Sequence, residues 1–387
     1  MTPAARYAAA IAVLDDVLAG ASAEKCLTTW ARSNRYAGSK DRAAVRDHVY
    51  DVLRQKRSLG ALGGSHTGRG LVLGLIRSQG IDANDVFGGG GYGPEALTDA
   101  EVDGGRQPET GAEAFDMPDW LWPIWAADLG ANAQAAAAAL QSRGPVALRV
   151  NLKRASVAEA IAQLAAQEIT AVKVDGVKTA LHVVENERKV HLCSAYVDGV
   201  VELQDVASQA AVAALNIAPS DRVLDFCAGG GGKALAMADI FGCAVTAHDI
   251  SQARMADIPI RAARAGVHID LCSTPDLAQQ APFDAVFVDA PCSGSGTWRR
   301  APEAKWQMTS EKLHNFSDLQ YEVLLNAAAH VGPKGQLIYA TCSVLYAENS
   351  AVIGRFLEGG TWKLHAEHQR IPDDNGDGFY YAVLHRA

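Results

Sequence analysis

Two cysteines are placed where they could carry chemistry, because each closes an apolar run typical of a buried strand. Cys292 ends the run that starts at Phe287, and Cys342 ends the run that starts at Ile338. A thiol at the carboxyl end of a strand lies where open α/β sheets place reactive groups. One free cysteine is usually a packing residue. Two of them, with a glycine-rich turn upstream, indicate a thiolate that attacks an electron-poor carbon.

The glycine-rich turn lies between a predicted strand, 222–227, and a predicted helix, 233–241. Glycines allow the backbone to approach a ligand closely and to adopt positive φ. A phosphate-binding P-loop does not fit, because Cys227 replaces its first glycine and Ala234 replaces its Ser or Thr. The loose dinucleotide-binding pattern does fit. With Asp249 placed to bind ribose hydroxyls, an NAD enzyme and a methyltransferase both remain open.

The composition is that of a globular enzyme with an uneven distribution of charge. Residues 1–80 carry twelve Lys or Arg against six Asp or Glu, although the net charge of the 387 residues is −9. A basic amino-terminal module is compatible with locally bound RNA or with a solvated helical face. The seven cysteines show no Cys-x-x-Cys spacing, which argues against a disulfide framework and a structural zinc site. No apolar run has the length of a membrane span and no secretory signal is evident, so we expect a cytoplasmic protein.

Hydrophobic periodicity divides the chain into four regions. It predicts a helical domain over 1–80, a Gly-rich linker over 81–112, a small helical and α+β domain over 113–205 with strands at 146–152, 171–174 and 181–184, and alternating strands and helices over 206–387. That alternation predicts a largely parallel sheet covered on both faces. The predicted strands of this last region are 222–227, 244–248, 267–271, 283–290 and 335–341, with an antiparallel edge strand at 379–384. The helices predicted between them are 233–241, 252–265 and 311–330.

A set of short motifs resembles the RsmB/Sun (NOL1/NOP2/Sun) branch of RNA (cytosine-5)-methyltransferases. The resemblance covers about residues 200 to 387, and the amino-terminal helices resemble a shortened NusB-like domain. It implies a Rossmann-like class I methyltransferase domain with a mostly parallel seven-stranded sheet, S-adenosyl-L-methionine as cofactor, and RNA, most often 16S rRNA, as substrate. The motifs are Glu202-Leu203-Gln204-Asp205, the turn from Asp225 to Lys233, Asp249-Ile250-Ser251, Asp289-Ala290-Pro291-Cys292-Ser293-Gly294, Lys305-Trp306 and Thr341-Cys342-Ser343.

The resemblance implies unequal roles for the two thiols. Position 5 of cytosine is too weak a nucleophile to take a methyl group, so a thiolate first adds to position 6. By the family's pattern Cys342 is this nucleophile and Cys292 assists release of the enzyme from the methylated base. Asp289 corresponds to the family acid near the methyl donor and position 3 of the base. Lys233 is expected to orient Asp289 or to lower a thiol pKa.

The resemblance also implies which residues hold the cofactor, and where this chain departs from the family. Ala-Pro is common where Gly229-Gly230 stands here, and the family's acid after the third strand is not evident among residues 271–274. We therefore assign no residue to adenine on that side. The expected cofactor residues are Asp225, Cys227, Ala228, Gly229, Gly230, Gly231, Gly232, Lys233, Asp249 and Asp289.

Several alternatives remain beside this interpretation. The substrate could be a cytosine of 23S rRNA or tRNA. A DNA cytosine-5 methyltransferase would not need Cys342, an NAD-linked oxidoreductase would leave both cysteines idle, and a non-catalytic RNA-binding protein would not need the Thr-Cys thiol. We expect a monomer that binds RNA, with no metal and no membrane association. Basic residues that could contact RNA, or be ordinary surface, are Arg143, Arg149, Lys153, Arg154, Arg299, Arg300 and Lys305, while Trp306 is expected in the core.

Overall fold

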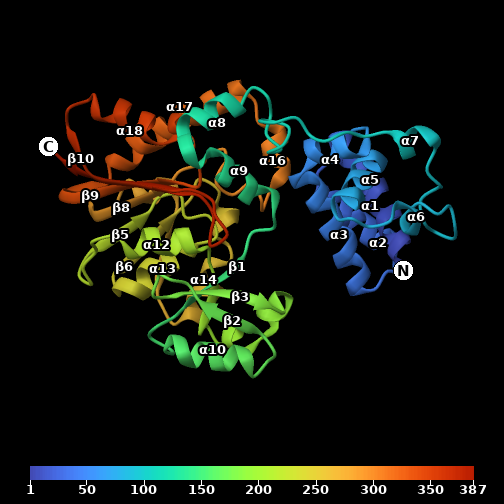
Figure 1. Ribbon diagram of the computed structural model, residues 1–387. Helices are drawn as coiled ribbons and strands as arrows, with labels where there is room; N and C mark the ends of the chain where they lie inside the picture. The colour runs from blue at the N-terminus through green and yellow to red at the C-terminus, as the bar shows by residue number, and fades with distance from the viewer. The chain divides into compact units, whose positions relative to one another are not determined.

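The computed structural model describes residues 1–387, which divide into two compact units. The helical unit comprises residues 1–143 together with 298–308, and the sheet unit comprises 144–297 and 309–387. Figure 1 shows the helices of the first unit and the strands of the second. None of the helices combines the length and apolar character that crossing a membrane requires.

The helical unit is built around helices that pack closely through glycine. A Cβ on Gly74 would lie 2.0 Å from the backbone oxygen of Leu59, so the neighbouring helices α4 and α5 contact each other backbone to backbone. Their apolar stripes, with those of α1 and α3, form the core of this unit. The helices are α1 (Pro3–Leu18), α2 (Ala23–Ser33), α3 (Ser39–Arg54), α4 (Lys56–Gly63), α5 (Gly68–Ser78), α6 (Ala83–Val86), α7 (Asp99–Asp103), α8 (Trp122–Leu129), η1 (Gly130–Asn132), α9 (Ala133–Gln141) and α16 (Pro302–Gln307).

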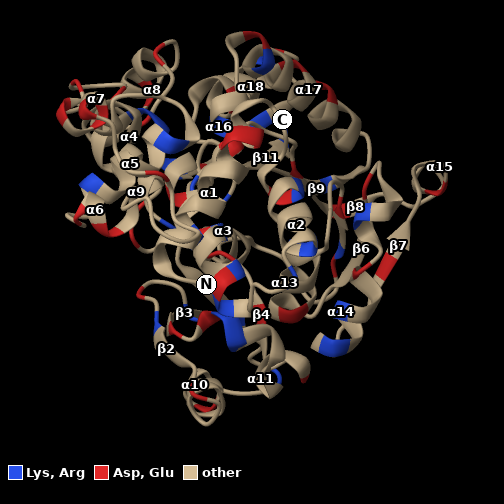
Figure 2. Ribbon diagram, turned by 90° about the vertical axis from the view of Figure 1, so that its right-hand side faces the viewer, with Lys and Arg blue, Asp and Glu red and all other residues tan.

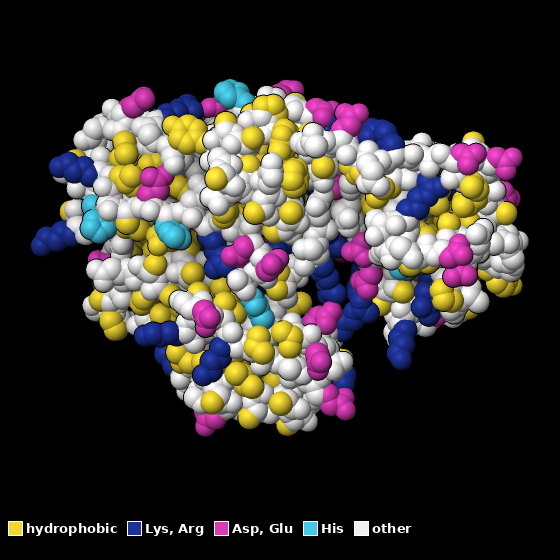
Figure 3. All heavy atoms as spheres, in the orientation of Figure 1, with side chains coloured by type: hydrophobic (Ala, Val, Ile, Leu, Met, Phe, Trp, Pro, Cys, Tyr) yellow, Lys and Arg dark blue, Asp and Glu magenta, His cyan; other side chains and the backbone are white.

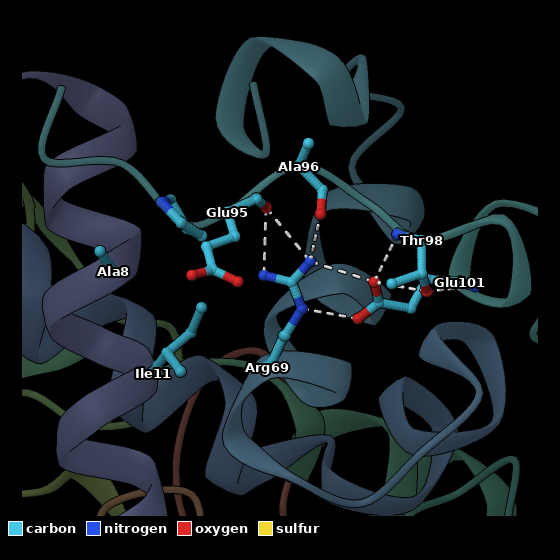
Figure 4. Close-up of a pocket in the computed structure, with 8 residues that line it drawn as sticks. Ala8, Ile11, Arg69, Glu95, Ala96, Thr98 and Glu101 are labelled. Atoms are coloured by element: carbon cyan, nitrogen blue, oxygen red, sulfur yellow. Dashed lines mark hydrogen bonds and ion pairs between the residues drawn. The ribbon is translucent and has the colours of Figure 1, made fainter. Parts of the chain in front are cut away.

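The segment between α6 and α7, inside the expected linker, is tied to α5 by Arg69 (Figure 4). The Arg69 guanidinium donates to the Glu101 carboxylate at 2.6 Å and to the backbone oxygens of Glu95 and Ala96 at 3.2 and 3.1 Å. Glu101 also accepts from the backbone N–H of Thr98, as part of the capping box that starts α7. One arginine thus satisfies carbonyl groups that a solvated loop would leave to water.

The sheet unit begins with a small antiparallel sheet of order β2-β3-β1-β4. Ser156 and Glu159 form the capping box of α10, which buries Ala160 and Leu164 against this sheet. The sequence predicts three of the strands but not β4, whose three residues are too few to show a period. The elements are β1 (Val146–Val150), α10 (Val157–Ala165), β2 (Thr170–Lys173), β3 (Ala180–Glu185), η2 (Glu187–Leu192), α11 (Ser194–Val197) and β4 (Val201–Leu203).

The seven-stranded sheet of the same unit has the order β10-β11-β9-β8-β5-β6-β7, which confirms the predicted fold class. The five neighbouring strands β9, β8, β5, β6 and β7 pair in parallel. At one edge, β11 pairs antiparallel with β9, and β10 pairs antiparallel with β11. Helices cover both faces, as predicted. The strands are β5 (Arg222–Asp225), β6 (Ala244–His248), β7 (Ile269–Cys272), β8 (Phe283–Asp289), β9 (Val331–Thr341), β10 (Trp362–Arg370) and β11 (Phe379–Arg386).

The helices between these strands differ from prediction in one place. Residues 252–265 are predicted as one helix, but Pro259 lacks the N–H that a continuous helix needs, and the segment divides into η3 and α14. The helical elements are α12 (Val206–Ala213), α13 (Gly232–Phe241), η3 (Gln252–Met255), α14 (Ile258–Ala265), α15 (Thr274–Leu277), α17 (Ser310–Ala328), η4 (Tyr346–Glu348) and α18 (Ser350–Leu357).

Arg149 of β1 is a structural residue, so neither of its two predicted alternatives, a contact with RNA or an ordinary surface position, is correct. It is 1% exposed, donates to the Gln204 side chain at 2.8 Å and forms a buried ion pair with Asp239 of α13. The pair fixes the small sheet to a helix of the large one. Its desolvation is tolerated because both charges are hydrogen bonded.

Asp239→Ala should therefore destabilise the protein strongly, because it leaves the Arg149 guanidinium buried without its counter-ion. We expect a loss of about 3 to 5 kcal/mol in the free energy of unfolding, measured by denaturant titration. Asp318→Ala is the control, since its partner Arg355 and Asp318 itself are half exposed, and it should cost less than about 1 kcal/mol. Equal small losses would contradict the structural role.

Candidate active site

The two predicted thiols meet at the carboxyl edge of the large sheet. Strands β8 and β9 pair in parallel with Asp289 opposite Ala340, so the turns that follow them are neighbours. Cys292 lies on the first turn and Cys342 on the second, and their Sγ atoms are 3.3 Å apart. Parallel pairing alone brings the turns together, because parallel strands end on the same edge. The two cysteines predicted at strand ends therefore lie in contact with each other.

The contact between the thiols separates their pKa values. The hydrogen bond with Cys292 lowers the pKa of Cys342, against burial and the charge of Asp289, and the Thr297 hydroxyl and Lys233 lower it further. The same hydrogen bond, followed by burial, raises the pKa of Cys292. Cys342 is therefore the more acidic of the two thiols. A thiolate is the form of cysteine that attacks carbon, so this direction favours Cys342 as the nucleophile.

Lys233 and Asp289 form an ion pair beside the thiols. The Lys233 Nζ, at the start of α13, lies 2.6 Å from the Asp289 Oδ2 at the end of β8. Burial lowers the pKa of Lys233, but the charge of Asp289 and the hydrogen bond to it raise the pKa above its ordinary value overall. Lys233 thus stays charged and orients the Asp289 carboxylate, and its charge also lowers the pKa of Cys342, so its position suits both of its predicted roles.

One cavity of about 1260 Å³ joins the thiols to the glycine-rich turn. Gly231 is the one predicted site residue that does not line this cavity. A Cβ at Gly231 would lie 2.7 Å from the Ile258 side chain, and its φ of +78° suits glycine. The predicted residues that line the cavity are Asp225, Cys227, Ala228, Gly229, Gly230, Gly232, Lys233, Asp249, Asp289, Cys292 and Cys342.

Asp249 holds the turn in place. Its carboxylate accepts from the backbone N–H of Gly229 and of Ser251, both at 2.9 Å, and pairs with Arg254 at 3.2 Å. Gly229 has a φ of +51°, which a residue with a Cβ adopts at a cost. The predicted ribose-binding acid is therefore also the anchor of the turn that would face the ribose.

Asp225 is a buried acid without an ion-pair partner at the same edge. It is 1% exposed, and neither carboxylate oxygen makes a hydrogen bond of good geometry with the protein. Burial, with the nearby charge of Asp289, raises the pKa of Asp225 to about 7, although Lys233 and the Ala234 N–H oppose the rise. A buried carboxylate that lines a cavity and lacks a partner fits a cationic ligand group. The ammonium of a bound amino-acid moiety meets this requirement, so the cavity fits S-adenosyl-L-methionine.

Two parts of the site were not identified from the sequence. At the β6 and β7 side of the cavity, His248 donates or accepts at the Thr274 hydroxyl across 2.9 Å. Behind the thiols, Glu348 contacts the serines that follow both cysteines. The repeated Cys-Ser pair, 292–293 and 342–343, is the signal that could have indicated a shared partner.

For Arg299 and Lys305 both predicted alternatives, a contact with RNA phosphate and a solvated loop, are wrong, because each side chain is only 1% exposed. Within the helical unit, Lys305 donates to the backbone oxygen of Arg54 at 3.1 Å, and Arg54 donates to that of Arg299 at 2.7 Å. Trp306 is half buried and donates its Nε1 to Leu53 O at 2.6 Å, in keeping with its expected packing role. Arg299 and Lys305 therefore stabilise the contact of the 298–308 segment with α3 instead of binding a ligand.

Comparisons with solved structures agree with this fold. The crystal structure of PH0851 aligns over 100% of this chain and 99% of its own, with a TM-score of 0.75 and 23% identity. NSun6 from Pyrococcus horikoshii, solved with SFG, aligns over 70% of this chain and 98% of its own, with a TM-score of 0.60 and 16% identity. At these identities the likeness concerns the fold.

Comparisons of sequence show the family. Residues 212–385 match the family described as 16S rRNA methyltransferase RsmB/F, and residues 117–191 match the ferredoxin-like domain of RsmF/B-like methyltransferases. Ribosomal RNA small subunit methyltransferase B of Xanthomonas campestris pv. campestris is 34% identical over 71% of this chain and 68% of its own length. Its counterpart from Proteus mirabilis is 30% identical over 73% and 70%. The chain therefore belongs to the 16S rRNA methyltransferase RsmB/F family.

Proposed function

We propose that this protein forms 5-methylcytosine in 16S rRNA, with Cys342 as the nucleophile. The observation that carries the proposal is the pair of thiols 3.3 Å apart, in which the contact lowers the pKa of Cys342 and raises that of Cys292. Neither an NAD-linked oxidoreductase nor a non-catalytic RNA-binding protein needs this arrangement. A site with only the Pro-Cys thiol would serve a DNA cytosine-5 methyltransferase.

The residues at the site divide the chemistry among themselves. The Cys342 sulfur adds to carbon 6 of the cytosine, which makes carbon 5 nucleophilic. As the sulfur adds, negative charge develops at nitrogen 3, which takes up a proton from water, and the resulting N–H donates to the Asp289 carboxylate that Lys233 orients. After carbon 5 has gained its methyl group, loss of the carbon 5 proton to water, assisted by Cys292, returns the electron pair to the ring and expels the Cys342 sulfur from carbon 6 as a thiolate. S-adenosyl-L-methionine, when bound, supplies the methyl group.

The cavity offers a binding group for each part of the cofactor except one. Asp225 would bind the ammonium of the cofactor, and the backbone of the Ala228–Gly232 turn would lie along its amino-acid chain. Asp249 would bind the ribose hydroxyls once its ion pair with Arg254 is broken. The family acid for adenine is missing after β7, and we assign no residue in its place.

Cofactor affinity should depend on pH through Asp225. Because its pKa is about 7, the carboxylate loses its charge as the pH falls below that value, and its attraction for an ammonium is lost. From pH 8 to pH 6 we expect the dissociation constant of S-adenosylhomocysteine, measured by calorimetry, to rise about tenfold. Asp225→Asn should bind weakly at both pH values, whereas Asp198→Asn, a change at an exposed acid, should keep the dependence. An unchanged pH profile in Asp225→Asn would contradict the assignment.

RNA is the proposed partner, and the helical unit offers a surface for it. Arg32, Arg35 and Arg42 line a hollow of about 560 Å³ between α2 and α3, and Tyr36 beside them is 74% exposed. Figure 3 shows Lys and Arg side chains projecting from this unit, and Figure 2 shows α2 with an acidic and a basic end. Exposed arginines beside an aromatic ring suit phosphates and unstacked bases.

Replacing Arg35 and Arg42 together by alanine should weaken RNA binding and its dependence on salt. Removing one arginine–phosphate interaction should reduce the slope of log K against log salt by about 0.7 to 0.9. Filter binding of a 16S rRNA fragment at several salt concentrations measures both effects. Lys363→Ala, at an exposed position of β10, is the control. If the double variant keeps the parent slope, RNA binds elsewhere.

The function is tested by methyl transfer from labelled S-adenosyl-L-methionine to undermodified ribosomal RNA. We expect label in 16S rRNA at one cytosine, mapped by nuclease digestion and mass spectrometry. Label confined to 23S rRNA or tRNA would support the proposed reaction but contradict 16S rRNA as the substrate. We further propose that the enzyme acts as a monomer in the cytoplasm, where ribosomal RNA is made and thiols remain reduced.

A further inference from the structure

Glu348 is a buried carboxylate behind the two thiols, and it has no basic partner. It ends the short helix η4 and is 0% exposed. Its Oε1 accepts from the backbone N–H of Ser293 at 2.7 Å and from Gln320 Nε2 at 3.0 Å. Its Oε2 accepts from the hydroxyls of Ser293 and Ser343, the latter at 2.5 Å. Four neutral donors therefore satisfy an acid that no Lys or Arg neutralises.

Three of these donors belong to the two turns that carry the cysteines. Ser293 directly follows Cys292, and Ser343 directly follows Cys342. One carboxylate thus joins the end of β8 to the end of β9 on the side away from the cavity. A second bond, 2.8 Å between the hydroxyls of Ser295 and Ser343, closes the same connection.

The position of Glu348 is itself fixed from two sides. The Tyr339 hydroxyl, on β9, donates to the backbone oxygen of Glu348 at 2.6 Å. The next residue, Asn349, accepts from the Thr341 hydroxyl at 2.6 Å and donates to the backbone oxygen of Ser343 at 3.0 Å. Residues fixed by several hydrogen bonds lose little further entropy when they hold a neighbour, which is how supporting residues preorganise a site.

The charge of Glu348 also acts on the nearer thiol. After the hydrogen bond to Cys342, burial and the charge of Cys342, the charge of Glu348 raises the pKa of Cys292. The pKa of Cys342 responds first to the hydrogen bond with Cys292 and then to burial, Asp289, Thr297 and Lys233. Glu348 makes two of its hydrogen bonds with Ser293, next to Cys292, and one with Ser343, so its charge favours the protonated form of Cys292.

We propose that Glu348 is a positioning residue that fixes the contact between Cys292 and Cys342 and keeps the shared proton on Cys292. It touches neither the RNA nor the cofactor and acts only through the two turns. The proposal rests on the proposed function for its purpose, since an unequal pair serves attack by one thiol and release by the other. The inequality itself is a property of the protein without substrate.

The test measures thiol reactivity in the absence of RNA and cofactor, so its outcome does not depend on the proposed function. The full-length protein is treated briefly with iodoacetamide at pH 7, and the label on each cysteine is measured by peptide mass spectrometry. The parent protein should carry label on Cys342 in preference to Cys292. Glu348→Gln keeps the shape and removes the charge, and the ratio of Cys292 to Cys342 label should rise about tenfold, which corresponds to about one pKa unit of lost separation.

A matched control is available in the helical unit. Asp116 is also 0% exposed and also accepts from backbone N–H groups, the Ser58 hydroxyl and the Gln141 side chain. Asp116→Asn should lower the melting temperature without changing the label ratio. A Glu348→Gln protein that folds with the parent label ratio overturns the proposal, as does an equal change in Asp116→Asn.

A second variant covers the case in which Glu348→Gln does not fold. Ser343→Ala removes one donor from the carboxylate and none of the charge, so it loosens the connection alone. Its label ratio should move in the same direction by a smaller factor, and its methyl transfer should show a lower kcat with an unchanged KM for the cofactor. The parent ratio in Ser343→Ala would then exclude the positioning role.

Discussion

Cys342→Ala is expected to abolish methyl transfer, with a loss of more than about 10³-fold in kcat. Without addition of the Cys342 sulfur at carbon 6, carbon 5 of cytosine has too little electron density to accept a methyl group. No other thiol in the cavity can substitute, because burial and the hydrogen bond to Cys342 raise the pKa of Cys292, and burial raises the pKa of Cys227 to about 12. Transfer of labelled methyl groups to undermodified 16S rRNA measures the loss.

The control for Cys342→Ala is a thiol with no chemical role. Cys243 is buried in the apolar core of the sheet unit and donates to the backbone oxygen of Met237. Cys243→Ala should lower stability by about 1 kcal/mol, as a small cavity does, and retain methyl transfer. If Cys342→Ala kept substantial activity while the folded content matched the parent, the nucleophile would have to be another residue.

The sequence was sufficient for the fold class, because that class depends on local pattern, and most of the site residues that it predicted line one cavity. Apolar runs predict β8 and β9, and their shared carboxyl edge follows from parallel pairing. The edge strand β10 was missed because most of its residues, from Lys363 to Gln369, are polar and exposed, so no alternation marks it. Its pairing with β11 is decided by the rest of the sheet.

Charge was the least reliable guide to the site. Arg149, Arg299 and Lys305 are basic and were predicted either to contact RNA or to be ordinary surface, yet all three are buried in contacts with residues distant in sequence. Glu348 was overlooked for the same reason, since a lone acid in a loop region is ordinarily a surface residue. Burial with satisfied hydrogen bonds is a tertiary property, so it cannot be inferred from residue type alone.

Cys292→Ala is expected to trap the protein on its RNA. Addition and methyl transfer need Cys342 and Asp289, which the substitution leaves in place. Cys342 loses the hydrogen bond that most lowers its pKa, but Thr297 and Lys233 still lower it. Release of the sulfur from carbon 6, in contrast, loses the help of the second thiol. The covalent complex should accumulate to a large fraction of the enzyme and migrate as a slower band on a denaturing gel. Turnover should fall to the rate of unassisted release, about 10²-fold or more below the parent.

The double variant Cys292→Ala with Cys342→Ala decides whether that band is the expected adduct. It should show no band, because the attacking sulfur is gone. If instead Cys292→Ala turned over normally and Cys342→Ala formed the adduct, the two roles would be reversed. The direction of the pKa shifts makes the first outcome the expected one, because the lowered pKa of Cys342 favours attack by that thiol and the raised pKa of Cys292 disfavours attack by the other.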